Sequence, residues 1–212
     1  MKKFIEVSFI VISGILVYLG ITQLPSIFPR KHIVFNSDKQ LRTTALQSLT
    51  SMPKTTEEVI KLTDNNINNP LSKEKIILGK LIFNGTLLSK NQDISCASCH
   101  KLKEGGDDNL PTAIGHNNLQ NPAHLNTPTV LNSALYFRQF WDARALNVEE
   151  QAAGPIQAPF EMNMTPVLIK KRVSSKSIYR DKFKKLNLEI TFDNITKAIA
   201  AYERTLLTRG AF

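Results

Sequence analysis

The chain has 212 residues, which is enough for one sizeable domain or two small ones. Its 27 lysines and arginines outnumber its 18 aspartates and glutamates, so the formal net charge is +9. No nucleic-acid-binding motif is present and aromatic residues are not interleaved with the basic ones, so we expect no nucleic-acid partner.

Residues 1–28 have the pattern of an export segment. Met1 is followed by two lysines, and an uncharged apolar run extends from Val7 to Ile21. A basic start followed by a short apolar run is typical of a secretory signal peptide. No residues with the spacing of a good cleavage site follow, and the run is short for a membrane span. A cleaved signal peptide and an uncleaved anchor in the inner membrane therefore both remain open.

Residues 29–54 form a polar connector, and we expect the ordered domain to extend from residue 55 to residue 212. The asparagine-rich stretch 64–70 ends in a proline and predicts a loop that stops any helix before it. Ser72 is a favourable N-cap residue, and apolar residues recur at helical spacing between Ile76 and Phe83. A helix is therefore expected directly before the next motif.

The stretch Cys96-Ala97-Ser98-Cys99-His100 contains both cysteines of the chain. Two thiols three residues apart, followed at once by an imidazole, are what covalent attachment of a c-type haem requires. In this chemistry Cys96 and Cys99 add across the two haem vinyl groups, and His100 binds the iron through a ring nitrogen. The motif predicts one covalently bound haem c.

Other uses of the same cysteines are less compatible with the sequence. A redox dithiol normally lies in a strand and helix context with one thiol of lowered pKa. A zinc site could use Cys96 and Cys99 with His116 and His124, but these histidines are eight residues apart, which is not a zinc-finger spacing. A disulfide between the two cysteines is a further alternative.

The remainder of the chain predicts helices separated by long loops. Residues 101–128 are rich in Gly, Asn, Asp and Pro, which indicates an irregular loop of the length that is usually functional. Helical patterns follow at 148–153, at 166–173 and from Thr191 onward, where Ile195, Ile199, Tyr202 and Leu206 share one stripe. The fold class is therefore mainly α, with almost no strand.

A basic cluster begins within the 166–173 pattern and extends to residue 185. It could steer an acidic electron donor toward the haem, but a solvated helix face is the more economical interpretation. Its members are Lys170, Lys171, Arg172, Lys176, Arg180, Lys182, Lys184 and Lys185.

Several motifs of the chain, in their order and spacing, are similar to those of one family. They are Leu78-Gly79-Lys80-Leu81-Ile82-Phe83, Ile94-Ser95-Cys96-Ala97-Ser98-Cys99-His100, Asn126-Thr127-Pro128-Thr129-Val130-Leu131-Asn132, Gln139-Phe140-Trp141-Asp142-Ala143-Arg144 and Gly154-Pro155-Ile156-Gln157. In these motifs the chain resembles the bacterial di-haem cytochrome c peroxidases, relatives of MauG. The resemblance covers about residues 55–212 and implies a c-type cytochrome-like haem domain, the N-terminal peroxidatic half of such an enzyme.

The resemblance also implies an activity and partners. Family members are periplasmic and reduce hydrogen peroxide to water with electrons from small cytochromes or copper proteins. Their second domain carries another haem, and this chain stops at Phe212, before that domain, so we expect a truncated or fragment form with one haem. The surface that the second domain would cover invites a homodimer. The alternative function is a single-haem electron-transfer cytochrome without peroxidase activity.

By resemblance, four further positions have roles at the haem. His116 matches the distal histidine that caps the iron at rest and must leave before peroxide binds. Glu161 matches the catalytic carboxylate, with Gln151 as its hydrogen-bonding neighbour. Trp141 matches a catalytic residue between the two haems that is thought to assist electron passage. Its other role is packing, with Asp142 and Arg144 paired nearby, and packing is the role we favour without the second haem.

Two further resemblances concern metal ligands. Asn126 matches a residue that helps bind calcium at the domain interface, where the other ligands are backbone oxygens of the second domain. The chain alone therefore gives little reason to expect calcium. Met162 and Met164 could suggest a methionine-ligated haem, but the matching positions lie beside the catalytic glutamate and not on the iron.

Overall fold

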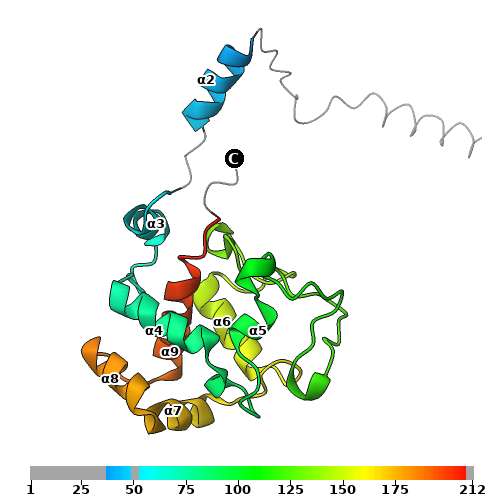
Figure 1. The fold of residues 1–212 in the computed structure, drawn as a ribbon, viewed down its shortest axis with the longest axis vertical. Helices are drawn as coiled ribbons and strands as arrows, with labels where there is room; N and C mark the ends of the chain where they lie inside the picture. The colour runs from blue at the N-terminus through cyan, green and yellow to red at the C-terminus, as the bar shows by residue number, and fades with distance from the viewer. Residues whose placement is uncertain (1–36, 49–52, 209–212) are drawn as a thin grey trace, which may run out of the picture. The chain divides into compact units, whose positions relative to one another are not determined.

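The computed structural model describes residues 37–48 and 53–208. Within these ranges the chain forms eight α-helices and no β-strand, which confirms the predicted mainly α fold (Figure 1). The chain divides into two compact units, residues 1–51 and 52–212. The predicted export segment lies outside the described residues, and none of the described helices is both long and apolar enough to cross a membrane.

The first unit contributes helix α2, Asp38–Ser48, which lies inside the stretch predicted to be a polar connector. None of the side chains described in this helix is buried. The connector prediction did not include a helix, because a polar helix without an apolar face gives no periodic signal. In the second unit α3, Thr56–Thr63, begins at a capping box between Thr55 and Glu58.

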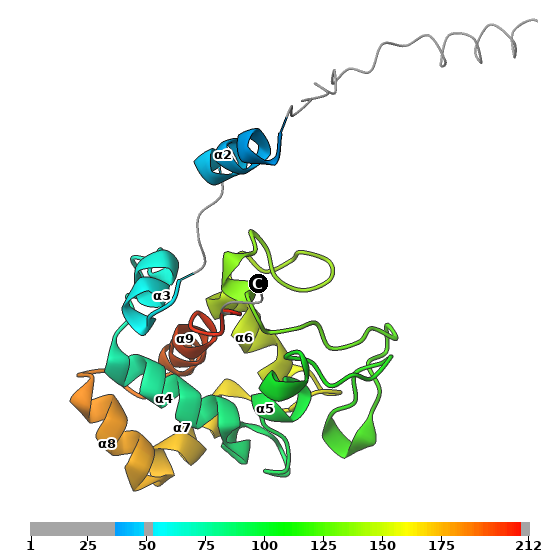
Figure 2. The same cartoon turned by 45° about the horizontal axis from the view of Figure 1, so that its top comes forward.

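The core of the second unit forms around α4, Lys73–Asn84, and α9, Phe192–Glu203. Both helices begin as predicted, because the Ser72 hydroxyl accepts from the Lys75 N–H and the Thr191 hydroxyl from the Asn194 N–H. Gly79 makes their close crossing possible, since a Cβ there would lie 1.9 Å from the Ala198 carbonyl oxygen. Figures 1 and 2 show the two helices side by side.

Helix α6, Val148–Gln157, packs against α9 and runs four residues further than predicted. The sequence pattern ends at Ala153 because a proline usually breaks a helix, yet Pro155 lies inside α6. The helix ends at Ala158, whose N–H donates to the Gly154 carbonyl. This longer helix carries Gln151 and leads directly into the turn that holds Glu161.

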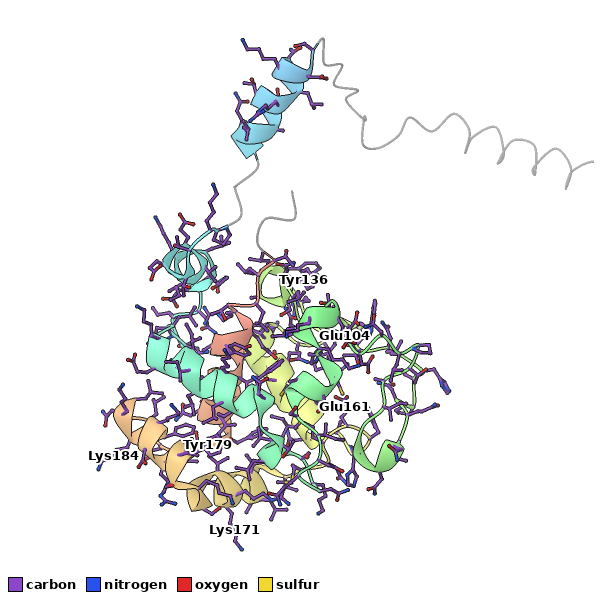
Figure 3. All side chains as sticks on the ribbon, viewed as in Figure 1. Glu104, Tyr136, Glu161, Lys171, Tyr179 and Lys184 are labelled. Atoms are coloured by element: carbon purple, nitrogen blue, oxygen red, sulfur yellow. The ribbon has the colours of Figure 1, made fainter. Side chains whose placement is uncertain are left out.

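Helices α7, Pro166–Ser175, and α8, Ser177–Lys185, carry the basic cluster. Lys171 and Lys184 extend from the surface of these helices in Figure 3, and the solvated-face interpretation holds for most of the cluster. Arg172 is the exception, because its guanidinium donates to the carbonyls of Leu87, Ser89 and Lys90. It therefore ties α7 to the segment that leads toward the cysteine motif.

Between the short helix α5, Cys96–Cys99, and α6, the chain is irregular, as predicted. It contains short 3₁₀ turns at Leu102–Glu104, His116–Asn118 and Ser133–Leu135. Three isolated β-bridges close small loops, and their pairs are Lys101 with Asp107, Ile114 with Gln120, and Gln139 with Ala145. These loops wrap one side of the helical core (Figure 2).

Candidate functional site

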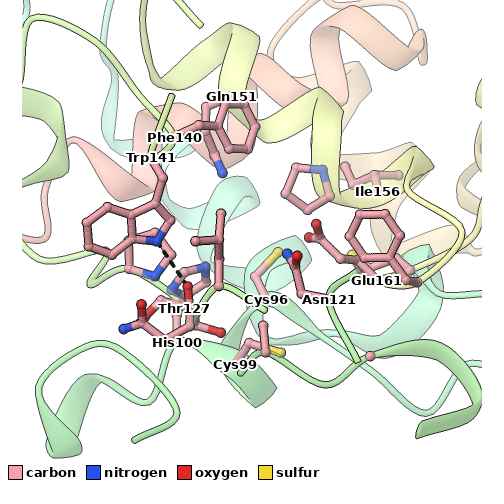
Figure 4. A pocket seen from close by; sticks show the side chains of 18 of the residues that line it. Cys96, Cys99, His100, Asn121, Thr127, Phe140, Trp141, Gln151, Ile156 and Glu161 are labelled. Carbon is pink, nitrogen blue, oxygen red and sulfur yellow. Dashed lines mark hydrogen bonds between the residues drawn. The ribbon is translucent and has the colours of Figure 1, made fainter. Parts of the chain in front are cut away.

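A cavity of about 320 Å³ lies between the helices and these loops. Its wall includes α5, the 113–115 and 121–128 segments, the 140–144 loop, α6 with the turn after it, and the end of α9. Figure 4 shows the cysteine pair, His100, Gln151 and Glu161 around this space. The cavity therefore brings together residues that are more than 60 positions apart in the sequence.

The cysteine motif forms one wall of the cavity. Ser95 and Ser98 form a capping box that starts α5, and the His100 N–H donates to the Cys96 carbonyl. The Nδ1 atom of His100 lies 3.1 Å from the Gly106 carbonyl oxygen, which can only accept, so Nδ1 carries the proton. The other ring nitrogen is then the unprotonated one, which is the form that binds a metal.

The two thiols have the properties of buried apolar groups. Burial raises the pKa of Cys99 to about 11 and that of Cys96 further, helped by nearby carboxylates. This argues against the redox dithiol, which needs a thiolate at neutral pH. Both cysteines are free, and no group of three or more metal-capable side chains occurs in residues 37–48 and 53–208, so these residues offer no ligand set for the zinc alternative.

Glu161 and Gln151 both line the same cavity. Glu161 lies in the turn after α6, where its N–H donates to the Ala158 carbonyl. Burial raises the pKa of the Glu161 carboxyl, and the positive charge of Arg144 partly opposes this. Arg144 is itself held by Asp142, 2.9 Å away, as predicted, and lies 3.5 Å above the Phe140 ring. A buried carboxyl of raised pKa is suited to proton transfer near neutral pH.

His116 is buried, but it is not among the residues that line the cavity. Its Nδ1 atom has no hydrogen-bond partner. Its backbone N–H donates to the Glu161 carbonyl at 2.7 Å, and a Cβ on the preceding Gly115 would lie 2.3 Å from the Phe160 carbonyl oxygen. The structure thus ties the His116 turn to the Glu161 turn without bringing the imidazole into the cavity wall.

The packing role that the sequence favoured for Trp141 is wrong. Its side chain is 61% exposed at the cavity, and its indole N–H donates to the Asn126 carbonyl at 3.1 Å. Phe140 takes the inward position, because its ring fits against Gly154 of α6. The Gln139–Ala145 bridge turns the loop so sharply that Phe140 and Ala143 adopt positive φ. Asn126 also lines the cavity, beside Trp141.

Met162 and Met164 are both buried in the core, and Met162 also lines the cavity, directly after Glu161 in the chain. His124 is exposed and does not line the cavity. Sequence reasoning missed Arg144 as a cavity residue, and it missed Asn121 and Glu203 altogether. Glu203 had a signal, because it falls four residues after Ile199 on the apolar stripe of the last helix.

The cavity fits a c-type haem on its own features. Two thiols and an imidazole with one free ring nitrogen stand on one wall, and aliphatic side chains of Ile94, Ile156 and Ile199 supply apolar surface. Such a set offers two attachment points and one axial ligand in a mainly apolar pocket. The donor chemistry therefore agrees with the sequence motif.

Comparisons with known proteins point in the same direction. The family described as di-haem cytochrome c peroxidase matches residues 73–212. The cytochrome c551 peroxidases of Nitrosomonas europaea and Pseudomonas aeruginosa are 49% and 42% identical over 144 and 143 residues, which cover 67% and 66% of this chain. These alignments cover 42% and 41% of the two relatives, so the chain spans about two fifths of their length.

A solved structure gives the same result for the fold. A MauG-like protein associated with microbial copper homeostasis superposes with a TM-score of 0.61 at 27% sequence identity. The superposition covers 68% of this chain and 43% of that chain. The helical arrangement around the cavity is therefore shared with MauG-like proteins.

Proposed function

Because the chain belongs to the di-haem cytochrome c peroxidase family, we propose that it is a c-type haem peroxidase domain that reduces hydrogen peroxide to water. One observation carries the proposal: the Cys96, Cys99 and His100 wall and the half-buried Glu161 carboxyl share one cavity. A haem there would supply an iron centre that binds peroxide and accepts electrons. The overall reaction consumes one peroxide, two electrons and two protons and forms two waters.

In this proposal the residues of the chain manage position and protons. Cys96 and Cys99 attach the haem, and His100 binds the iron through the nitrogen left free by its bond to Gly106. The Glu161 carboxylate accepts a proton from peroxide and returns it to the departing oxygen, and the Gln151 amide orients the peroxide by hydrogen bonding. Burial of Glu161 supports this role, because it raises the pKa of its carboxyl.

His116 is proposed as the distal ligand of the resting state, which must leave before peroxide can enter. Its unpartnered Nδ1 supports a ligand role, since a buried polar atom without a partner is costly. His116 does not line the cavity, which supports a state in which its imidazole is away from the iron. The bond from its backbone to Glu161 would couple that movement to the position of the catalytic carboxylate.

The setting of the enzyme belongs to the same proposal. We place it in the periplasm, soluble or anchored in the inner membrane by residues 1–28, with residues 29–54 as connector and residues 55–212 as the haem domain. One haem c is carried by this chain, and a small periplasmic cytochrome or copper protein supplies the electrons. In a second domain, another haem would pass these electrons toward Trp141, which the cavity mouth exposes.

A second candidate function is electron transfer without catalysis. It starts from the same buried, unpartnered His116 nitrogen, because a haem held permanently by His100 and His116 would have no open position for peroxide. Such a carrier stays low-spin in both redox states and does not bind cyanide. A peroxidase becomes high-spin and binds cyanide once His116 leaves.

The test uses the full chain matured with haem in a host that attaches it covalently. Intact mass gives the haem count, and oxidation of a reduced small cytochrome is then followed with and without hydrogen peroxide. Glu161→Gln should lower peroxide turnover by about 10²–10⁴-fold, the usual share of general acid–base catalysis, and leave the haem spectrum unchanged. Absence of covalent haem, or of turnover in a protein that binds cyanide, would overturn the proposal.

A further inference from the structure

Glu203 is a second buried carboxyl in the wall of the same cavity, and the proposed reaction does not use it. It lies at the end of α9 and is 5% exposed. Among the described residues no hydrogen bond to its carboxyl is found. The effects that act on the carboxyl are its own burial and the nearby carboxylate of Glu149 on α6. Burying an unpaired carboxylate is unfavourable, and burial raises the pKa of Glu203 to about 8.

The neighbours of Glu203 in the chain hold it in this position. Tyr202 packs edge-on against Phe83 of α4, with 5.3 Å between the ring centroids. Arg204 is fully buried on another side, where its guanidinium donates to the carbonyls of Thr63 and Asn69 and to Glu149. These two anchored neighbours fix the backbone at residue 203, and the Glu203 side chain itself is 5% exposed.

The charged groups around Glu203 leave it without a compensating cation. From α5 it faces the Cys96 thiol, whose pKa it helps to raise, and from α6 it faces Glu149, which is already paired with Arg204.

Two further helices, α4 and α7, pack against α9, and their nearby cations are already bonded elsewhere. The Lys75 ammonium of α4 donates to Asn69 and Pro70, and the Arg172 guanidinium of α7 to carbonyls near Ser89. The carboxylates that raise the pKa of the His100 ring, against the larger lowering effect of burial, are Asp108 and Asp107, and Glu203 is not among them.

A haem attached through Cys96 would place a redox centre in the cavity that Glu203 faces. The ferric haem core carries one more positive charge than the ferrous core, and this charge favours an ionised neighbour. Reduction removes the charge, so the same carboxyl binds a proton more tightly in the ferrous state. Trp141 and Asn126 are exposed and line the same cavity, so a proton would reach Glu203 from their side.

We propose that Glu203 is a proton-uptake site coupled to reduction of the haem held in this cavity, an inference that rests on the haem site of the proposed function. In the coupled step an external one-electron donor reduces ferric to ferrous haem, and the Glu203 carboxylate takes one proton from solvent and becomes a carboxylic acid. One electron and one proton enter together, so the net charge of the cavity stays constant. Glu203 thus balances the charge of the haem by binding a proton, and it takes no part in oxygen–oxygen cleavage.

The test is a spectroscopic redox titration of the haem-loaded full chain at a series of pH values from neutral to alkaline. The midpoint potential should be constant where Glu203 is protonated in both redox states. Between its ferric-state and ferrous-state pKa values it should fall by up to about 59 mV for each tenfold drop in proton activity, the one-electron equivalent. Glu203→Gln should remove this component, because the amide has the size of the acid and does not titrate.

Two further variants control for fold and for net charge. Glu203→Asp should keep a pH-dependent potential, since it retains a carboxyl at the same place. Glu189→Gln removes the same charge from an exposed position and should leave the slope of the parent unchanged. If the haem-loaded parent and Glu203→Gln have identical midpoint potentials at every pH, the inference about Glu203 is overturned and the proposed function is not. A preparation without covalent haem would overturn the proposed function on which it rests.

Discussion

Arg144 is the residue whose charge most directly opposes the effect of burial on Glu161. If Glu161 must be ionised to accept a proton, kcat/KM for peroxide falls at pH values below the Glu161 pKa. Arg144 lowers that pKa, so Arg144→Ala should raise it and move the acid limb of the pH profile to higher pH. The measurement is kcat/KM for peroxide against pH.

Arg144→Lys is the matched control for this prediction. It keeps a positive charge near Phe140 and Asp142 but loses the planar group that lies above the ring. Its acid limb should stay close to that of the parent. An acid limb that does not move in Arg144→Ala would mean that Glu161 is not the group whose ionisation limits the reaction.

At this scale the sequence predicts chemistry better than it predicts exposure. The cysteine motif and its histidine were recognisable because their spacing is a chemical requirement. Trp141 was misjudged because the Gln139–Ala145 loop, and not the residue type, decides that Phe140 turns inward. Glu203 was missed because its place on the apolar stripe does not reveal which groups surround its carboxyl, and these are fixed only when the helix packs.

The crossing of α4 and α9 is the element that fixes the cavity wall, and Gly79 is its closest point. Gly79→Ala would gain up to about 1 kcal/mol of helix propensity in isolation. In the fold, its Cβ would meet backbone atoms of Ala198, which cannot rotate away. We expect a net loss of stability of about 1–3 kcal/mol or more, as for other overpacked cores.

Chemical denaturation followed by far-UV circular dichroism measures this loss. Lys80→Ala is the control, because it changes an exposed side chain of the same helix and should alter the free energy of unfolding by less than about 0.5 kcal/mol. Equal stability of Gly79→Ala and the parent would show that the helices can separate at little cost.

Helix positions were largely predictable where caps and apolar periodicity agree, as at Ser72 and Thr191. The predictions failed where only packing decides. Helix α6 continues through Pro155 because its last turn is held by the Ala158 N–H and by contacts with α9. Helix α2 has no buried side chain, so no periodic signal could announce it.

In the second unit of the chain, several large hydrophobic side chains between α5 and α6 are exposed. In residues 135–146, just before α6, they are Leu135, Tyr136, Phe137, Trp141 and Leu146. Tyr136 marks this segment in Figure 3. Exposed apolar side chains gathered in one segment commonly indicate an interaction surface. Residues 135–146 are therefore the segment in which the homodimer predicted from the sequence can be tested.

Phe137 is 89% exposed, so Phe137→Ser removes apolar surface at little cost in folding stability. If this segment drives self-association, sedimentation velocity over a range of concentrations should show a smaller dimer fraction for Phe137→Ser than for the parent. Ile67→Ser is the matched control, because Ile67 is 92% exposed in the loop between α3 and α4 and should leave the dimer fraction unchanged. A parent that stays monomeric at every concentration would contradict an interface at residues 135–146. Equal effects of the two substitutions would also contradict it, since general hydrophobicity would then explain the association equally well.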